Sequence, residues 1–218
     1  RPRALLLDEP LASPDIRLRN SALQLLARTI AAAEMPVLYV SHDLGEILRL
    51  TDQIAILDRG RLVGSGTYTN LLHDTAVWSL VRDRGAVNAI PASLLRQDPE
   101  EGLSVVRVGD RADVNQEIFV PAVDGGPGAR VTLSIPPWDV ALASGRVESV
   151  SIQNQLRGTV TRITEHERGV LVEVDIGAPL FAEISRRAAG AMGLRAGSPV
   201  VCLIKTQAIA AQGSTPWA

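Results

Sequence analysis

The sequence has one cysteine, seven aromatic residues and a single lysine among its 22 basic residues. The lone cysteine, Cys202, excludes an internal disulfide. No apolar run approaches the roughly 18 residues that a membrane-spanning helix needs. The net charge of −2 and the scarcity of aromatic rings disfavour a nucleic-acid-binding protein, which needs a basic surface and rings for stacking. These absences favour a soluble globular protein of a reducing compartment.

The chain also lacks an initiator methionine and the pattern of a signal peptide. Arg1-Pro2-Arg3 leads directly into an apolar run, so we expect the chain to begin inside a longer protein. Its 218 residues give room for one large or two small domains.

The first 82 residues carry an α/β pattern. Short apolar runs at 4–7, 37–40 and 53–57 alternate with helical spacing over 15–33 and about 44–50. Strand–helix alternation of this kind is typical of a parallel α/β sheet.

After a linker at 83–88 the sequence pattern becomes typical of β-strands, and the sequence contains an internal repeat. Gly128–Pro136 aligns with Gly197–Lys205 at nearly the same offset as Gly102–Val105 with Gly169–Val172. The repeat predicts two tandem OB-like β-barrel units, at 89–147 and 148–212. The expected fold class is therefore α/β followed by all-β, with one short helix inserted at 185–194.

Acidic residues and a histidine end the first two predicted strands. Asp8 and Glu9 follow the first strand, and His42 follows the second. Alone, an acidic pair is also typical of helix capping, but here it stands in LLLDEPLASPD, followed by LYVSHD. Over residues 1–80 this resembles the Walker B, D-loop and switch-histidine motifs of ABC-transporter ATPase subunits, which contain a P-loop NTPase-like parallel sheet. A Ser41-His42-Asp43 triad is disfavoured, because adjacent residues at a strand end point to different faces.

The resemblance implies a role for each of these residues. Asp8 would hold the Mg²⁺ of MgATP through water, Glu9 would polarise the attacking water, and His42 would contact the γ-phosphate. Asp15 would bind at the nucleotide site from the D-loop, across the ATPase dimer interface. A P-loop needs a lysine after its glycines, and the single lysine, Lys205, follows Cys-Leu-Ile. Since the signature and Gln-loop motifs are missing as well, we expect no ATP hydrolysis by this chain alone.

The second β-rich unit resembles the molybdate-binding TOBE or Mop domain. The resemblance rests on SIQNQLRG at 151–158, Glu-Ile-Ser at 183–185, the Ala- and Gly-rich segment that follows, and LIKT at 203–206. It implies an oxyanion site, which in this family lies between partner domains. The implied molybdate-binding residues are Ser151, Gln153, Asn154, Ser185, Lys205 and Thr206. Gln153 departs from the usual arginine. The first unit has Pro136 where the second has Lys205, so we expect it to serve as structural support.

Together the two halves resemble the C-terminal part of the ATP-binding subunit of a molybdate ABC importer, the ModC type. This implies ATP and Mg²⁺ as cofactors, molybdate or tungstate as ligand, a homodimer of ATPase subunits, and an integral-membrane permease as partner. The expected location is the cytoplasmic side of the inner membrane, as a peripheral protein. Two alternatives remain open: a non-catalytic molybdate- or tungstate-binding module, and the ATPase subunit of a sulfate-type or sugar importer.

Overall fold

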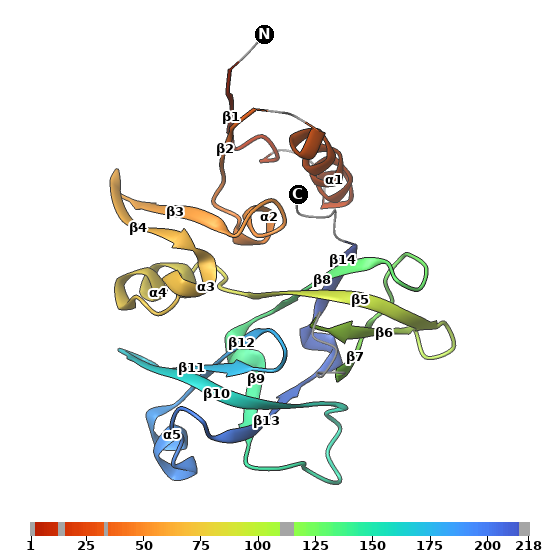
Figure 1. The fold of residues 1–218 in the computed structure, drawn as a ribbon, viewed down its shortest axis with the longest axis vertical. Coiled ribbons are helices and arrows are strands. Elements are labelled where there is room, and N and C mark those ends of the chain that lie inside the picture. The colour runs from red at the N-terminus through yellow and green to blue at the C-terminus, as the bar shows by residue number, and fades with distance from the viewer. Residues whose placement is uncertain (1–2, 13–15, 33–34, 110–115, 214–218) are drawn as a thin grey trace.

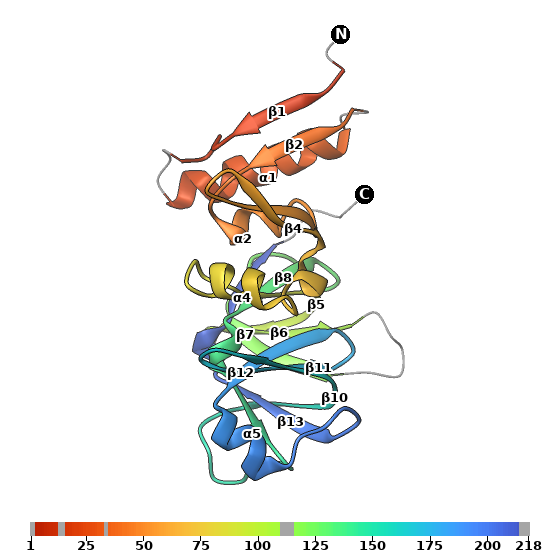
Figure 2. The same ribbon diagram turned by 90° about the vertical axis from the view of Figure 1, so that its left-hand side faces the viewer.

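The structure is a computed structural model that describes residues 3–12, 16–32, 35–109 and 116–213. Its elements stack along one long axis, with the N-terminal strands at one end and the last α-helix at the other (Figures 1 and 2). No helix within the described ranges is long and apolar enough to cross a membrane.

The N-terminal part begins with two parallel strands, as predicted. β1 (Leu5–Asp8) pairs with β2 (Val37–Val40), and α1 (Ile16–Ala32) connects them. The short α2 (Leu44–Ile47) follows, capped by Asp43, whose carboxylate accepts from the N–H of Glu46 at 3.2 Å.

The third predicted strand differs from expectation. β3 (Gln53–Asp58) lies outside the parallel β1–β2 sheet and pairs antiparallel with β4 (Arg61–Thr67). Arg59 and Gly60 between them both have positive φ, 48° and 75°. Positive φ at both central residues is typical of the type I′ turn that closes a tight hairpin. The turn therefore gives β3 an immediate partner, and the described residues hold only two parallel strands of the expected sheet.

The β-rich half consists of two five-stranded sheets of the same design. The first repeat contributes β5 (Asn88–Asp98), β6 (Leu103–Val108), β7 (Gln116–Pro121), β8 (Arg130–Ile135) and β9 (Val140–Ala143). The second contributes β10 (Asn154–His166), β11 (Gly169–Asp175), β12 (Pro179–Ile184), β13 (Pro199–Ile204) and β14 (Ala210–Gly213). In both repeats a bulge falls seven residues after the initial asparagine, at Leu95 and Thr161.

Each repeat sends its last strand into the sheet of the other. After the short 3-10 helix η1 (Pro137–Asp139), β9 pairs with β13 in the second sheet. After η2 (Thr206–Ala208), β14 pairs with β8 in the first. The sheet orders are β14-β8-β5-β6-β7 and β12-β11-β10-β13-β9. The two predicted units therefore exchange their last strands. Their boundaries at 88/89 and 147/148 stay a prediction.

One hydrophobic core joins the two sheets. It includes Leu133 and Ile135 from the first repeat and Val172 and Cys202 from the second, all fully buried. Burial raises the pKa of the Cys202 thiol to about 12. The short helix predicted inside the second repeat is confirmed as α5 (Arg186–Met192).

Two further helices attach the N-terminal part to the second sheet. α3 (Tyr68–Leu71) follows β4 directly, and α4 (Thr75–Arg82) comes next and contacts β10 (Figure 1). Trp78 of α4 packs in one cluster with Leu171 of β11 and Phe181 of β12. The helices therefore cover part of the outer face of the second sheet.

Gly158 of the SIQNQLRG segment lies where strands approach closely. A Cβ atom added there would lie 2.4 Å from Cγ1 of Val174 and 2.8 Å from the carbonyl oxygen of Asp175. We expect Gly158→Ala to lower the free energy of unfolding by about 1–3 kcal/mol, because the backbone must shift to admit the methyl group.

Gly190 in α5 provides the matched control, since a Cβ atom there meets nothing within 4 Å. Gly190→Ala should stabilise the chain by up to about 1 kcal/mol, because alanine is the better helix former. Urea unfolding of both variants measures the two effects. Equal stability of Gly158→Ala and wild type would contradict the close approach.

Candidate functional site

The parallel pairing of β1 and β2 brings the predicted catalytic pair together. The N–H of Glu9 donates to the carbonyl of Val40 at 2.9 Å, which continues the strand pairing by one residue. The Glu9 carboxylate then accepts from the backbone N–H of His42 at 3.0 Å and lies 2.8 Å from its ring Nδ1. Glu9 adopts a left-handed conformation with φ of 44°, which is uncommon for a non-glycine residue.

The Glu9 contact changes the protonation of His42. The hydrogen bond and the negative charge of Glu9 raise the pKa of His42 above its ordinary value. The His42 side chain is 80% exposed, so the imidazole remains open to a ligand. Because the pKa is raised in the folded state, the pair stabilises the fold below the unfolded-state pKa of about 6.5. This contribution is lost as the pH rises through the folded-state pKa.

A buried glutamate that the sequence analysis missed supports the histidine segment. Glu46 of α2 accepts hydrogen bonds from the hydroxyls of Tyr39, at 2.9 Å, and Ser41, at 3.1 Å. The Ser41 hydroxyl also accepts from the N–H of Asp43 at 3.1 Å. Ser41 is thus engaged away from the His42 ring, which agrees with the exclusion of a triad. The available signal was the position of Glu46 three residues after the capping Asp43, where a helix often carries an acid.

The structure shows less of the other predicted nucleotide-site residues. Asp8 is exposed at the end of β1, and Asp15 lies outside the described residues. Within the described part of the chain, no three His, Cys, Asp or Glu side chains form a metal-binding group. MgATP therefore fits only in part: Asp8 offers one carboxylate to a hydrated Mg²⁺, but no lysine is present to meet the phosphates.

Three of the predicted oxyanion residues, Asn154, Lys205 and Thr206, lie together where β10 begins and β13 ends. Asn154 is paired with Ile204 across the sheet, which places it beside the Lys205-Thr206 turn. Its side-chain amide lies 3.4 Å from the Thr206 hydroxyl. Lys205 is exposed at this turn and Thr206 is half-buried.

Ser151 and Gln153 are exposed in the segment leading to β10. Gln155 holds this segment in place. The side chain of Gln155 accepts from the N–H of Val147 at 2.9 Å and donates to its carbonyl at 2.8 Å. Gln155 stands within the SIQNQLRG motif, but it was not among the residues predicted from the sequence to form the site.

Ser185 lies apart from this cluster within one chain. It caps α5, accepting from the N–H of Ala188 at 3.1 Å. It follows Ile184, which pairs with Val170, and Val170 pairs in turn with Glu165 near the far end of β10. Ser185 and Asn154 are therefore at opposite ends of β10.

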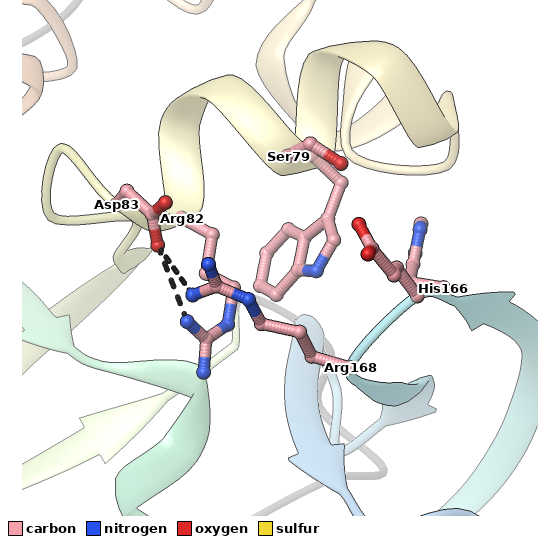
Figure 3. A pocket seen from close by; sticks show the side chains of 7 residues that line it. Ser79, Arg82, Asp83, His166 and Arg168 are labelled. Carbon is pink, nitrogen blue, oxygen red and sulfur yellow. Dashed lines mark hydrogen bonds and ion pairs between the residues drawn. The ribbon is translucent and has the colours of Figure 1, made fainter.

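A small cavity lies where α4 meets the β10–β11 turn, at the end of β10 nearer to Ser185 and opposite to Asn154. It has a volume of about 60 Å³ and is lined by Trp78, Ser79, Arg82, Asp83, His166, Glu167 and Arg168 (Figure 3). Both arginines pair with Asp83, so their charge is partly neutralised. His166 is 4% exposed, and burial lowers its pKa. A space of this size, with balanced charges, suits water better than an oxyanion.

Comparison with known proteins identifies relatives of this chain. A family model described as "TOBE domain" matches residues 150–211. Molybdenum import ATP-binding protein ModC of Rhizobium meliloti (strain 1021) is 33% identical over 210 residues, covering 95% of this chain and 57% of the relative. The protein of the same name from Rhodospirillum rubrum is 34% identical over 217 residues, with the same coverage.

A solved structure of the cytoplasmic molybdate-binding protein ModG, with molybdate bound, is also similar. It is 17% identical, with a TM-score of 0.47, covering 59% of this chain and 96% of that one. From the sequence relatives, the chain is homologous to the C-terminal part of molybdenum import ATP-binding proteins, and it spans about 57% of their length.

The Glu9–His42 contact is testable by NMR titration of the His42 ring. We expect Glu9→Gln to lower the pKa of His42, because it removes the negative charge that favours the protonated ring. Asp8→Asn is the control: Asp8 is the neighbouring acid but is not among the groups that raise this pKa. An unchanged His42 pKa in Glu9→Gln would contradict the assigned contact.

Proposed function

We propose that the chain is the C-terminal part of the ATP-binding subunit of a molybdate importer, and that its second β repeat binds molybdate or tungstate as a sensor. The observation that carries this proposal is the difference between the two repeats at one equivalent turn. The second repeat has Lys205 and Thr206 there, beside Asn154, whereas the first has Pro136 and Pro137. The names of the relatives and the TOBE match over 150–211 support the choice of ligand.

The chemistry of the Lys205 turn suits a tetrahedral dianion. Such an anion needs several N–H or O–H donors and a compensating positive charge. Lys205 supplies the charge, while Thr206, Ser151 and the amide of Gln153 supply donors from the same end of the sheet. Proline at the equivalent turn of the first repeat supplies neither a charge nor a backbone N–H.

Ser185 enters this proposal through the expected homodimer. Since it lies at the opposite end of β10 within one chain, we propose that it reaches the Lys205 turn of a second copy. The anion would then be held between partner chains.

The N-terminal part is proposed to act in ATP hydrolysis in the intact subunit. Bound MgATP would supply the phosphoryl group and the metal, with Asp8 facing the hydrated Mg²⁺. Glu9 holds His42 by hydrogen bonds to its backbone and ring, so a carboxylate and an imidazole are fixed side by side. Asp15 is assigned to the dimer interface. The subunit is assigned to the cytoplasmic side of the inner membrane, where it would bind an integral-membrane permease. A non-catalytic oxyanion-binding module and a sulfate-type or sugar importer remain the alternatives that the experiments below separate.

Lys205→Ala tests the oxyanion site. We expect it to weaken molybdate binding about ten- to a hundredfold, since a charge-assisted contact to an anion is worth roughly 1.5–3 kcal/mol. Pro136→Ala, at the equivalent position of the first repeat, should leave the affinity unchanged. Titration calorimetry with molybdate, tungstate and sulfate measures both variants.

Three results of this titration would count against the assignment. Equal weakening by both variants would move the site away from the Lys205 turn. Sulfate binding as tightly as molybdate would favour the sulfate-type importer. No heat with any oxyanion would favour the sugar importer and remove the sensor function.

The catalytic proposal predicts that the 218-residue chain alone shows no Mg²⁺-dependent ATP hydrolysis. The reason is that Lys205, its only lysine, stands outside any glycine-rich phosphate loop. A phosphate-release assay checks this, with molybdate binding as the control for a folded sample. Turnover that Glu9→Gln abolishes would contradict the prediction.

A further inference from the structure

The side-chain amide of Asn154 has no N–H left with which to bind an anion. Its side chain is buried, with 1% of its surface exposed. Its oxygen accepts from the backbone N–H of Phe119 at 2.8 Å, and its amide nitrogen donates to the Phe119 carbonyl at 2.9 Å. The second hydrogen of the same nitrogen faces the Thr206 hydroxyl at 3.4 Å. An asparagine amide has two N–H donors, and both are engaged here.

The orientation of this amide is fixed by chemistry. Phe119 presents one donor and one acceptor from its backbone, and only one of the two amide orientations satisfies both. The oxygen of Asn154 must therefore face the Phe119 N–H, which places the amide nitrogen between the Phe119 carbonyl and Thr206.

The first repeat contains the same arrangement without the anion-binding turn. Asn88, 3% exposed, accepts from the N–H of Phe181 at 2.7 Å and donates to its carbonyl at 2.9 Å. Its second N–H goes to the backbone carbonyl of Ile135 at 3.0 Å. Each asparagine thus joins the first strand of its own repeat to a strand of the other. Asn88 makes this link beside Pro136, which offers an anion neither a charge nor an N–H. The link between the repeats therefore does not depend on an anion.

The two asparagines differ only in the acceptor of the second N–H. In the first repeat the acceptor is a backbone carbonyl, whereas in the second it is the hydroxyl of Thr206. A hydroxyl that accepts a hydrogen bond keeps its own hydrogen for donation elsewhere. Thr206 is half-buried and follows the exposed Lys205, so this hydrogen is available at the turn.

We propose that Asn154 is a positioning residue, which orients the Thr206 hydroxyl toward the oxyanion and does not itself contact it. The proposal rests on the proposed function, because it assigns a role within that oxyanion site. In this arrangement Thr206 and Lys205 touch the anion, while Asn154 ties the turn to Phe119 of the first repeat.

A double-mutant cycle on the full 218-residue chain tests the proposal, with molybdate affinity measured by titration calorimetry. Thr206→Val removes the hydroxyl and should weaken binding about tenfold or more. Asn154→Ala should weaken binding by a similar factor, and the double variant should bind no more weakly than Thr206→Val alone. Asn88→Ala, the matched control, should lower stability to the extent that Asn154→Ala does and leave the affinity unchanged.

If the two single losses multiply in the double variant, Asn154 contacts the anion independently and the proposal is overturned. Equal weakening by Asn88→Ala would also overturn it, because the effect would then be a general loss of structure. Absence of binding by the wild-type chain overturns the proposed function, and the positioning role with it.

A measurement on the wild-type chain covers the case in which Asn154→Ala does not fold. Molybdate should shift the NMR signals of Lys205 and Thr206 more than those of the Asn154 side-chain amide. The reverse order would show direct contact by Asn154 and overturn the proposal.

Discussion

The exchange of the last strand between the two sheets is the constraint on which the β-rich half depends. β9 and β14 each complete the sheet of the other repeat, so neither repeat can satisfy its backbone hydrogen bonds alone. The two sheets then enclose one core rather than two. Asn88 and Asn154 add a second link between the repeats, each bonding to the backbone of a phenylalanine in the other repeat. The position of the Lys205 turn is therefore set by both repeats at once.

The second sheet also holds the N-terminal part in place. Trp78 of α4 packs against the outer face of β11 and β12, and Arg82 donates to the largely buried carboxylate of Glu183 at 2.7 Å. A buried charge requires such a partner, because leaving it unpaired costs several kcal/mol. The segment that carries Glu9 and His42 is thus connected to the second repeat through α4, rather than through a flexible linker.

Local signals predicted much of this from the sequence. The first two strands, α1 and α5 follow from apolar periodicity and from turn residues such as Gly193, which takes the left-handed conformation after α5. The meeting of Glu9 and His42 follows from parallel pairing. The alternation of apolar and polar residues in a four-residue strand such as β9 does not specify which strand it pairs with. The exchange of strands could therefore not be predicted. The separation of Ser185 from Lys205 depends on that same long-range pairing, and motif order along the chain does not reveal it.

The single cysteine can report on the opening of the two sheets, because of where it lies. Cys202 lies on β13, between β10 and the exchanged strand β9, with its thiol in the common core. Burial both hides the sulfur and, by raising its pKa to about 12, suppresses the reactive thiolate. Alkylation of this thiol therefore requires the sheets to separate. The rate of alkylation therefore reports how often the exchanged fold opens, and it can be measured on the unmodified chain without an introduced label.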